Sequence, residues 1–471
     1  MKKYSAAAAV ISVVIFLVLS CEPDVETDYQ AYMSDSPERA VLVLNGSAES
    51  ISAIDPETES VYNDIQLVGY GSSSRAIPAD ILIYDEGIHV ILSGQNSIES
   101  YNKNSLDYEA EHYFKNGYNP MSFISVPGTS WVFCAGFETD DVQPVDLSNP
   151  ETGYSFVDSW TEVVLPDDAD SEYQTTPTGT NAVGDNFSRS SSGGAVLSNG
   201  SESRLYVTNV RYDSSILLTE SVSAGGYFRE ATLSIFSFNA DAMVSGASDS
   251  SLAFELTAEI NLEDIYYTAG ADENYSEYLP GNGLNPQSAF ILDNLLNIVC
   301  TGTNGGSTSY YSADEYIPDG FDQDDEKPGT NPDDGVILVL DISDPDEPSY
   351  LTHLHIGGSP VGCRESIDYD NKIVYLAGVG GLQSYQYGST AGDYSVLHGY
   401  DDMIITADDV DSDYYAGLCY DSYSNKLFVS FYSNDSVNTI DISGSSPDFN
   451  YTEGSVFSVS DGPGALCIFE R

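Results

Sequence analysis

The clearest pattern along the chain is a five-residue strand in which an apolar residue opens the segment and another stands just before a polar residue at its end. One copy, ILVLD at 337–341, runs straight into the acidic stretch SDPDEP. Six further segments have the same form: ISAID (51–55), IESYN (98–102), VQPVD (142–146), LSIFS (233–237), LQSYQ (382–386) and VNTID (437–441). Three of the six intervals between them measure 44 to 47 residues. A period in the forties indicates a repeat architecture.

Each copy has a similar context. A strand precedes it, such as LYVTN at 205–209 or KLFVS at 426–430, and another strand precedes that one, entered through dipeptides such as Asn119-Pro120. A turn rich in Asp, Asn, Ser and Pro follows, and then a fourth strand, such as 350–356. Four short strands in each of seven units predict an all-β fold, a seven-bladed β-propeller of four-stranded antiparallel blades.

The order of strands also predicts how the ring closes. The segment AVLVL (40–44), which precedes the first copy, matches the second strand of a blade, so blade 1 lacks its innermost strand at this end. The C-terminal segment PGALCIF (463–469) matches an innermost strand with nothing after it. We therefore expect the C-terminal strand to complete blade 1 and leave no open sheet edge there.

Two repeats resemble known families. LYVTN followed by a strand with a late polar residue resembles the YVTN propeller repeat, and ILVLDISDPDEPSYLTHLHIGGSP resembles the LVIVD repeat of bacterial surface proteins. The resemblance covers nearly the whole chain after its leader, although LQSYQ and LSIFS lack the aspartate. It implies the propeller fold, which hosts many unrelated activities and so leaves function open.

The N-terminus has the layout of an export signal. A short basic region (1–3) precedes an apolar run (6–19), and this run is too short to span a bilayer comfortably. The following residues, up to Cys21, resemble the lipobox of bacterial lipoproteins. That resemblance implies cleavage after residue 20, a lipid on Cys21, and a protein anchored in the bacterial cell envelope on its periplasmic or outer surface. We expect residues 1–20 to be a signal peptide, 21–38 a disordered acidic tether and 39–471 the propeller.

The net charge of −59 argues against nucleic acid or anionic lipid surfaces as partners. Two explanations remain open: solubility in a saline habitat, or carboxylates that bind divalent cations. The most metal-like stretch is PDGFDQDDEKPGTNPDDG, 318–335, whose oxygen ligands suit calcium although the EF-hand pattern fails at Lys327. The candidate calcium ligands are Asp319, Asp322, Asp324, Asp325, Glu326, Asp333 and Asp334; no other cofactor is indicated.

Four insertions lengthen the connections of blades 3 to 5: 161–193, 211–231, 262–284 and 303–335. All four join a second to a third strand, or one blade to the next, so we expect them on one face of the ring. Long loops on a rigid scaffold commonly carry binding function, and their Tyr-rich composition suits protein or glycan ligands. The candidate binding residues are Tyr266, Tyr267, Tyr275, Tyr278, Tyr310, Tyr311 and Tyr316.

Motifs for catalysis are sparse. No Ser–His–Asp arrangement, CxxC pair or haem-attachment motif is found, and the cysteines after Cys21 stand mostly in apolar strands, where we expect buried free thiols. His353 and His355 alternate on a predicted outer strand, where two ordinary half-exposed histidines are favoured over a metal pair. The sequence favours a lipid-anchored binding or scaffold protein over an enzyme. The alternative is a propeller hydrolase or lyase, and three or more convergent His, Asp or Glu at the central channel would favour it.

Overall fold

A computed structural model defines the fold. It describes most of the chain from Asp28 onwards, in the following segments: 28–69, 75–114, 117–137, 141–148, 163–164, 191–210, 212–213, 227–228, 231–245, 254–268, 284–301, 335–361, 366–406, 415–445 and 448–470.

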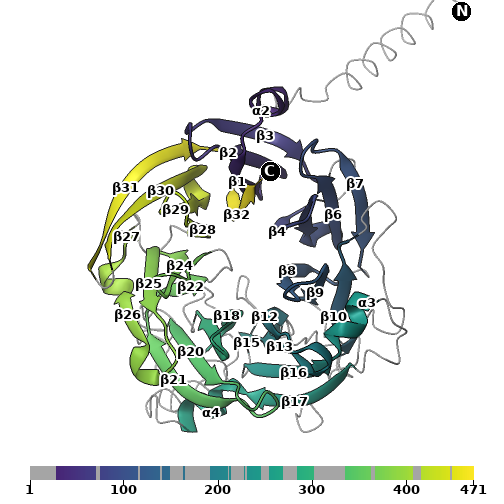
Figure 1. The fold of residues 1–471 in the computed structure, drawn as a ribbon, viewed down its shortest axis with the longest axis vertical. Helices are drawn as coiled ribbons and strands as arrows, with labels where there is room; N and C mark the ends of the chain where they lie inside the picture. The colour runs from purple at the N-terminus through teal and green to yellow at the C-terminus, as the bar shows by residue number, and fades with distance from the viewer. Residues whose placement is uncertain are drawn as a thin grey trace, which may run out of the picture.

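Seven antiparallel sheets stand around a central axis in a closed ring (Figure 1). Six of them have four strands, and the sheet of blade 6 adds two short strands to a path of four. The structure thus confirms the predicted seven-bladed propeller. In each blade we call the strands first to fourth from the axis outward.

The blades of the first half comprise the following strands. Blade 1 has β32 (Pro463–Glu470), β1 (Arg39–Asn45), β2 (Ser50–Ile54) and β3 (Val61–Leu67); blade 2 has β4 (Pro78–Tyr84), β5 (Gly87–Leu92), β6 (Ser97–Asn102) and β7 (Tyr108–Tyr113); blade 3 has β8 (Pro120–Ser125), β9 (Trp131–Gly136), β10 (Asp141–Asp146) and β11 (Val163–Val164).

The remaining blades follow the same order. Blade 4 has β12 (Ser191–Leu197), β13 (Ser203–Asn209), β16 (Thr232–Phe238) and β17 (Glu255–Asn261); blade 5 has β18 (Pro286–Leu292), β19 (Leu295–Cys300), β20 (Val336–Asp341) and β21 (Ser349–His355); blade 6 has β22 (Ser359–Val361) with β23 (Ile367–Asp368), then β24 (Ile373–Val379), β25 (Gly381–Gln386) with β27 (Ile405–Thr406), and β26 (Ser395–His398); blade 7 has β28 (Tyr415–Asp421), β29 (Lys426–Phe431), β30 (Ser436–Ser445) and β31 (Asp448–Ser458).

Short elements lie between the blade strands. They are the β14–β15 pair (Tyr212–Asp213 and Tyr227–Phe228), the helices α2 (Tyr29–Asp35), α3 (Ala240–Ser245) and α4 (Leu262–Thr268), and the 3-10 turns η1 (Ser93–Gln95), η3 (Gly200–Glu202), η9 (Ala391–Asp393), η10 (Tyr400–Asp402) and η11 (Tyr432–Asn434).

Every copy of the sequence repeat forms the third strand of its blade: β2, β6, β10, β16, β20, β25 and β30. These strands are buried on both sides between neighbouring blades, as in β20, whose first five residues are all buried. Burial on both sides explains why they read as apolar runs rather than as a strict alternation of apolar and polar residues.

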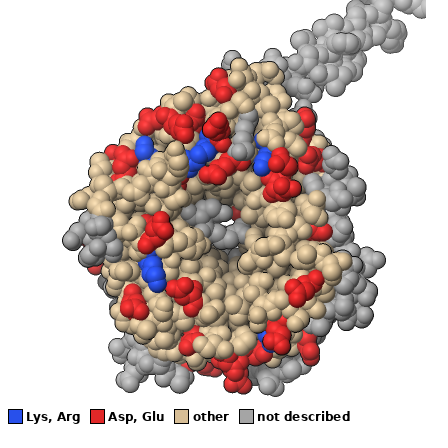
Figure 2. All heavy atoms as spheres, viewed as in Figure 1, with Lys and Arg blue, Asp and Glu red and all other residues tan. Residues whose placement is uncertain are grey.

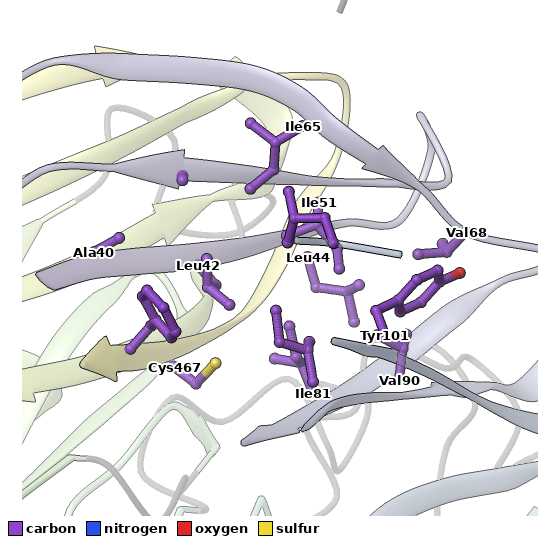
Figure 3. Close-up of a cluster of buried hydrophobic side chains, with 14 of the residues drawn as sticks. Ala40, Leu42, Leu44, Ile51, Ile65, Val68, Ile81, Val90, Tyr101 and Cys467 are labelled. Atoms are coloured by element: carbon purple, nitrogen blue, oxygen red, sulfur yellow. The ribbon is translucent and has the colours of Figure 1, made fainter. Parts of the chain in front are cut away.

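The ring closes as predicted. β32 pairs antiparallel with β1, and Val41 lies opposite Ile468 in that ladder. Cys467 and Phe469 of β32 are buried in the hydrophobic cluster between blades 1 and 2, where Figure 3 shows Cys467 beside Leu42 and near Ile81. The C-terminal strand therefore supplies both backbone pairing and core packing to a blade whose other strands come from the N-terminal end.

Part of the segment expected to be a disordered tether, 21–38, is ordered in the structure. Within residues 28–38, α2 forms and packs on the outside of β3 (Figure 1). The side chain of Tyr32 is only 1% exposed, because it enters the cluster between blades 1 and 2. A single buried aromatic residue in an otherwise polar segment was too weak a signal to predict this packing.

Candidate functional site

The connections between strands divide the ring into two faces. We call the face with the connections from second to third strand, and from one blade to the next, the loop face; the other is the turn face. The four long connections on the loop face are 165–190, 210–231, 262–285 and 301–335. They confirm the predicted placement, except that β11 occupies 163–164 and the first connection therefore starts later than expected.

Long connections are not confined to the loop face. On the turn face, residues 147–162 join β10 to β11, and residues 239–254, which include α3, join β16 to β17. Neither was among the four insertions predicted from the sequence. In blades 3 to 5, long connections therefore join strand ends at both faces, and the longest of them join strand ends at the loop face.

The structure describes two of the seven predicted binding tyrosines, both on α4. Tyr266 is on α4 as part of the loop-face connection 262–285, but it is only 2% exposed and packs in the cluster between blades 4 and 5. Its ring contacts His353 edge-on, with 5.2 Å between centroids. Tyr266 therefore packs in the core between the blades, and its assignment as a binding residue stays a prediction. Tyr267 follows it on α4, and the other five candidates lie outside the described residues: Tyr275, Tyr278, Tyr310, Tyr311 and Tyr316.

The lipidation and calcium predictions also fall outside the described residues. Cys21 precedes the first of them, and all seven acidic candidates between Asp319 and Asp334 belong to the connection between β19 and β20. Both remain predictions. Within the part of the chain that the structure describes, no group of three or more His, Cys, Asp or Glu side chains is placed to hold a metal ion.

Figure 2 shows an opening at the centre of the ring. Near the loop-face end of the first strands, the pairing with the second strand shifts by one residue in six of the seven blades. Such bulges commonly border functional sites because they redirect side chains. In five of these blades the bulged residue is uncharged: Ala79, Met121, Ser192, Gln287 and Ala416.

The first strands of neighbouring blades approach one another closely around the axis. A Cβ added at Gly193 would lie 3.0 Å from the carbonyl oxygen of Gln287 in the next blade. At Gly417 an added Cβ would lie 2.1 Å from the carbonyl oxygen of Gly464, so only glycine fits there. At these two positions, backbone atoms of neighbouring first strands therefore approach each other too closely for a larger side chain.

Acidic groups on the described first strands are engaged by the protein itself. Asp80 accepts hydrogen bonds from its neighbour Ile81 N–H (2.9 Å) and from Phe123 N–H (2.8 Å) in blade 3. At the opposite end of the strands, both Asp421 and Glu470 pair with Arg39. In blade 6, the carboxylate of Asp368 caps its own turn. These four carboxylates sit at different ends of the channel, and each has a structural partner.

In blades 2 and 6, a buried polar side chain forms hydrogen bonds with the connection from the previous blade. This side chain belongs to the third residue of the third strand. Gln383 donates to the carbonyl oxygens of Ile356 (2.8 Å) and Gly357 (3.1 Å). Glu99 accepts from Gly69 N–H at 2.8 Å and from the Tyr101 hydroxyl. Burial raises the pKa of Glu99. The loop-face connections at blades 2 and 6 thus have a fixed base inside the sheet.

The acidic run after ILVLD belongs to the scaffold. Asp341 accepts from the backbone N–H of Ser343 at 2.8 Å, and the Ser343 hydroxyl lowers the pKa of Asp341. Asp55 and Asp146 accept equivalent bonds from residues two positions on, as expected for aspartates at strand ends. Asp441 differs, because its carboxylate lies 3.5 Å from the amine of Lys426.

The same acidic run joins two blades. Asp346 accepts two bonds of 2.7 Å from the guanidinium of Arg204 in blade 4, a paired geometry that strengthens a charge-assisted contact. Arg204 lowers the pKa of Asp346. The Tyr206 hydroxyl adds a bond of 3.0 Å to the carbonyl oxygen of Pro345. Local sequence patterns do not mark this contact, because its two charges are 142 residues apart in the chain.

All six lysine and arginine side chains among the described residues lie within 4 Å of a carboxylate: Arg39, Arg75, Lys103, Arg204, Lys372 and Lys426. Five of these, all but Arg75, belong to the turn-face ends of strands or to turn-face connections. Figure 2 shows acidic side chains distributed around the ring with few basic ones among them. With 74 acids against 15 bases in the whole chain, the net field is strongly negative.

The histidines behave as structural residues. His353 and His355 lie on β21 as predicted, with ring centroids 4.9 Å apart and the rings nearly perpendicular. The Nδ1 atom of His353 is 2.7 Å from the Tyr350 hydroxyl. In blade 2, burial lowers the pKa of His89 and His112 to about 4, so both are neutral at pH 7. Cys134, Cys300, Cys419 and Cys467 are all buried, as expected for those four.

Comparison with solved structures finds similar folds. The periplasmic gluconolactonase of Pseudomonas aeruginosa is 11% identical, with a TM-score of 0.52 over 91% of this chain and 98% of that chain. A putative 6-phosphogluconolactonase of Bacteroides fragilis is 9% identical, with a TM-score of 0.51 over 92% and 98%. At these identities the likeness shows the fold alone. No protein-family model and no curated protein matches the sequence significantly, and no helix among the described residues is long and apolar enough to cross a membrane.

Proposed function

We propose that this propeller is a lipid-anchored binding or scaffold protein of the bacterial cell envelope, which recognises a protein or glycan through the loop face of blades 3 to 5. One observation carries the proposal. Four long connections at 165–190, 210–231, 262–285 and 301–335 leave one face of a closed ring. A rigid ring that displays long loops is the usual arrangement for recognition.

The electrostatics and the sequence add support. The described cations are all paired with carboxylates, which leaves a negative surface that disfavours anionic ligands such as nucleic acids. The lipobox-like Cys21 and the likeness to YVTN and LVIVD repeats support a place in the cell envelope. Protein or neutral glycan ligands fit these features best.

Hydrolysis of a sugar lactone at the central channel is the second candidate, favoured by the likeness to propellers named as gluconolactonases. Such an enzyme would need acid–base groups that converge on a substrate. The carboxylates of Asp80, Asp421 and Glu470 are instead bonded to backbone or arginine groups. The geometry of the described residues therefore supports binding better than catalysis.

The test compares loop variants of residues 28–471. In one variant, 303–334 is replaced by a short Gly-Ser turn; in the matched control, 149–161 on the turn face is shortened in the same way. All forms are applied to a glycan array and to an envelope extract of the native bacterium, and gluconolactone hydrolysis is assayed in parallel. We expect the loop-face variant to lose at least tenfold in affinity for whatever the intact protein captures and the control to retain it.

Equal capture by both variants would reject the loop face as the binding surface. If the intact protein hydrolyses gluconolactone and the Asp80→Asn substitution lowers the rate, the hydrolase is supported in place of the binding proposal. The calcium prediction is tested with the same proteins: calcium should raise the melting temperature of the intact chain more than that of the variant lacking 303–334. If calcium raises the melting temperature of neither protein, the calcium prediction is rejected.

A further inference from the structure

The short helix α2 fastens the N-terminal end of the described chain to the outer rim of blade 1. Asp28 N–H donates to the carbonyl oxygen of Asn63 (2.9 Å), and Asn63 N–H donates back to the Asp28 carboxylate (2.8 Å). At the other end of the helix, the Tyr62 hydroxyl donates to the Asp35 carboxylate at 2.9 Å. Both ends of α2 are thus bonded to β3, the outermost strand of the blade.

The helix also reaches blade 2. Tyr32 is 1% exposed in the cluster between blades 1 and 2, and its ring meets that of Tyr62 edge-on at 5.5 Å. The Tyr29 hydroxyl donates to the carbonyl oxygen of Ser105, in the turn after β6, at 3.1 Å. Contacts with two blades fix both the position and the direction of α2. The chain therefore meets the ring at one defined point on its rim.

That point lies across the ring from the long connections. Figure 1 shows α2 outside β3 at one edge of the disc, and β17, β20, β21 and α4 at the opposite edge. Blades 4 and 5, to which these elements belong, carry the loop-face connections 210–231 and 301–335. The attachment point and the proposed recognition surface thus stand at opposite ends of one diameter.

The connection from the proposed lipid to the rim is short. Six residues lie between Cys21 and Asp28, and the connection from one to the other spans at most about 25 Å. A ring of this chain length is roughly 55 Å across. With α2 docked, the rim of blades 1 and 2 must stay near the membrane surface, whereas blades 4 and 5 are free to stand about twice as far away.

We propose that the propeller stands on its rim at the membrane, with blades 1 and 2 toward the lipid and blades 4 and 5 pointing away from it. This proposal rests on the lipid anchor of the proposed function. Charge supports the upright orientation: the whole chain carries a net charge of −59, and a ring laid flat would bring more of its acidic surface against an anionic lipid surface than a ring standing on its rim. The partner recognised by the long connections is then a soluble molecule or a molecule on a surface opposite the membrane, not a lipid.

The test measures two heights above a bilayer. Residues 21–471, with Cys363→Ser, are coupled through Cys21 to a maleimide lipid in vesicles containing anionic lipid, so the result does not depend on lipidation in the cell. A donor dye is placed through an azide-bearing residue at Glu57 or at Glu347, and an acceptor dye is placed in the membrane. Both positions are exposed and lie in the turn between third and fourth strands, in blade 1 and in blade 5.

We expect strong energy transfer from position 57 and weak transfer from position 347. Equal transfer from the two positions would mean that the ring lies flat, and it would overturn the proposal. Failure of the native protein to carry a lipid in cells would instead reject the anchor while leaving this geometry intact.

Release of α2 provides the matched variants. Tyr32→Ala should free the helix and lengthen the connection to Arg39, so that it spans up to about 60 Å, and the difference between the two positions should shrink. Tyr266→Ala removes an equally buried tyrosine from α4 at the opposite rim and should leave the difference unchanged. If Tyr32→Ala fails to fold, Tyr29→Phe combined with Asp28→Asn weakens the same attachment. The proposal would also be overturned if proteolysis shows that α2 is released and the difference in energy transfer between positions 57 and 347 is nevertheless unchanged.

Discussion

Blade 1 and the junction of blades 4 and 5 are stabilised by the same two kinds of contact, but these contacts are buried to different degrees. Each has an arginine that pairs with a carboxylate of a neighbouring blade and a short helix that inserts a buried tyrosine between blades. At blade 1 the carboxylate, Asp421, is 2% exposed; at the other junction Asp346 is 39% exposed. The more buried contact is found where the two ends of the chain meet.

The difference follows from chain connectivity. Blades 4 and 5 are joined by residues 262–285, so their separation is limited even when the ion pair breaks. Blade 1 draws β32 from the far end of the sequence, and only non-covalent contacts hold it against β1. The closing blade therefore depends on burial, and blades with continuous chain are free to carry long connections.

Removal of the closing strand should have the largest effect. Deletion of residues 464–471 removes most of β32, including Phe469, which is fully buried. Blade 1 then loses its innermost ladder, and its core opens to water. We expect the cooperative thermal transition to disappear in circular dichroism. A melting curve like that of the intact chain would contradict closure by β32.

The ion pair at the closing blade should come next. Arg39→Met leaves the buried carboxylate of Asp421 without its charged partner, and removal of one member of a buried pair costs about 3–5 kcal/mol. Urea unfolding measures the loss. The double variant Arg39→Met with Asp421→Leu should recover part of that stability, since it removes the uncompensated charge. No loss in the single variant would show that the pair does not hold the blade.

The matched pair at blades 4 and 5 should matter less. Arg204→Met should cost about 1 kcal/mol, because solvent screens the exposed side of Asp346. Arg204 holds the pKa of Asp346 below its ordinary value of 3.8. The contribution of this pair is thus present above about pH 4 and is lost as the pH falls through the lower pKa of the folded state. A stability difference between wild type and Arg204→Met that did not shrink as the pH falls below 4 would contradict this assignment.

Local pattern sufficed for much of the fold. The third strands are buried on both sides, so ILVLD and its relatives are readable as apolar segments with a fixed polar end, and counting strands inward from 40–44 and 463–469 was enough to predict closure. The turn role of Asp341 was also predictable, because its hydrogen bond is to its own next residues.

Contacts between distant residues were not predictable in this way. Arg39 and Asp421 are 382 residues apart, and no local pattern marks either as a partner. Tyr266 was assigned to a binding surface because its segment is a Tyr-rich insertion, yet α4 turns that ring into the core. The packing of α2 was not predicted for the same reason: the burial of Tyr32 depends on a groove between blades that only the closed ring creates.

The most direct test of the central claim, closure of the ring between the two ends of the chain, needs one substitution. Leu42 lies opposite the native Cys467 in the β1–β32 ladder, and directly opposed residues are close enough for a disulfide. After mild oxidation, Leu42→Cys should yield a disulfide-linked peptide joining positions 42 and 467 by mass spectrometry. Val43→Cys, which is opposite Leu466, should not. A folded Leu42→Cys protein with no such peptide would contradict the closure on which this account depends.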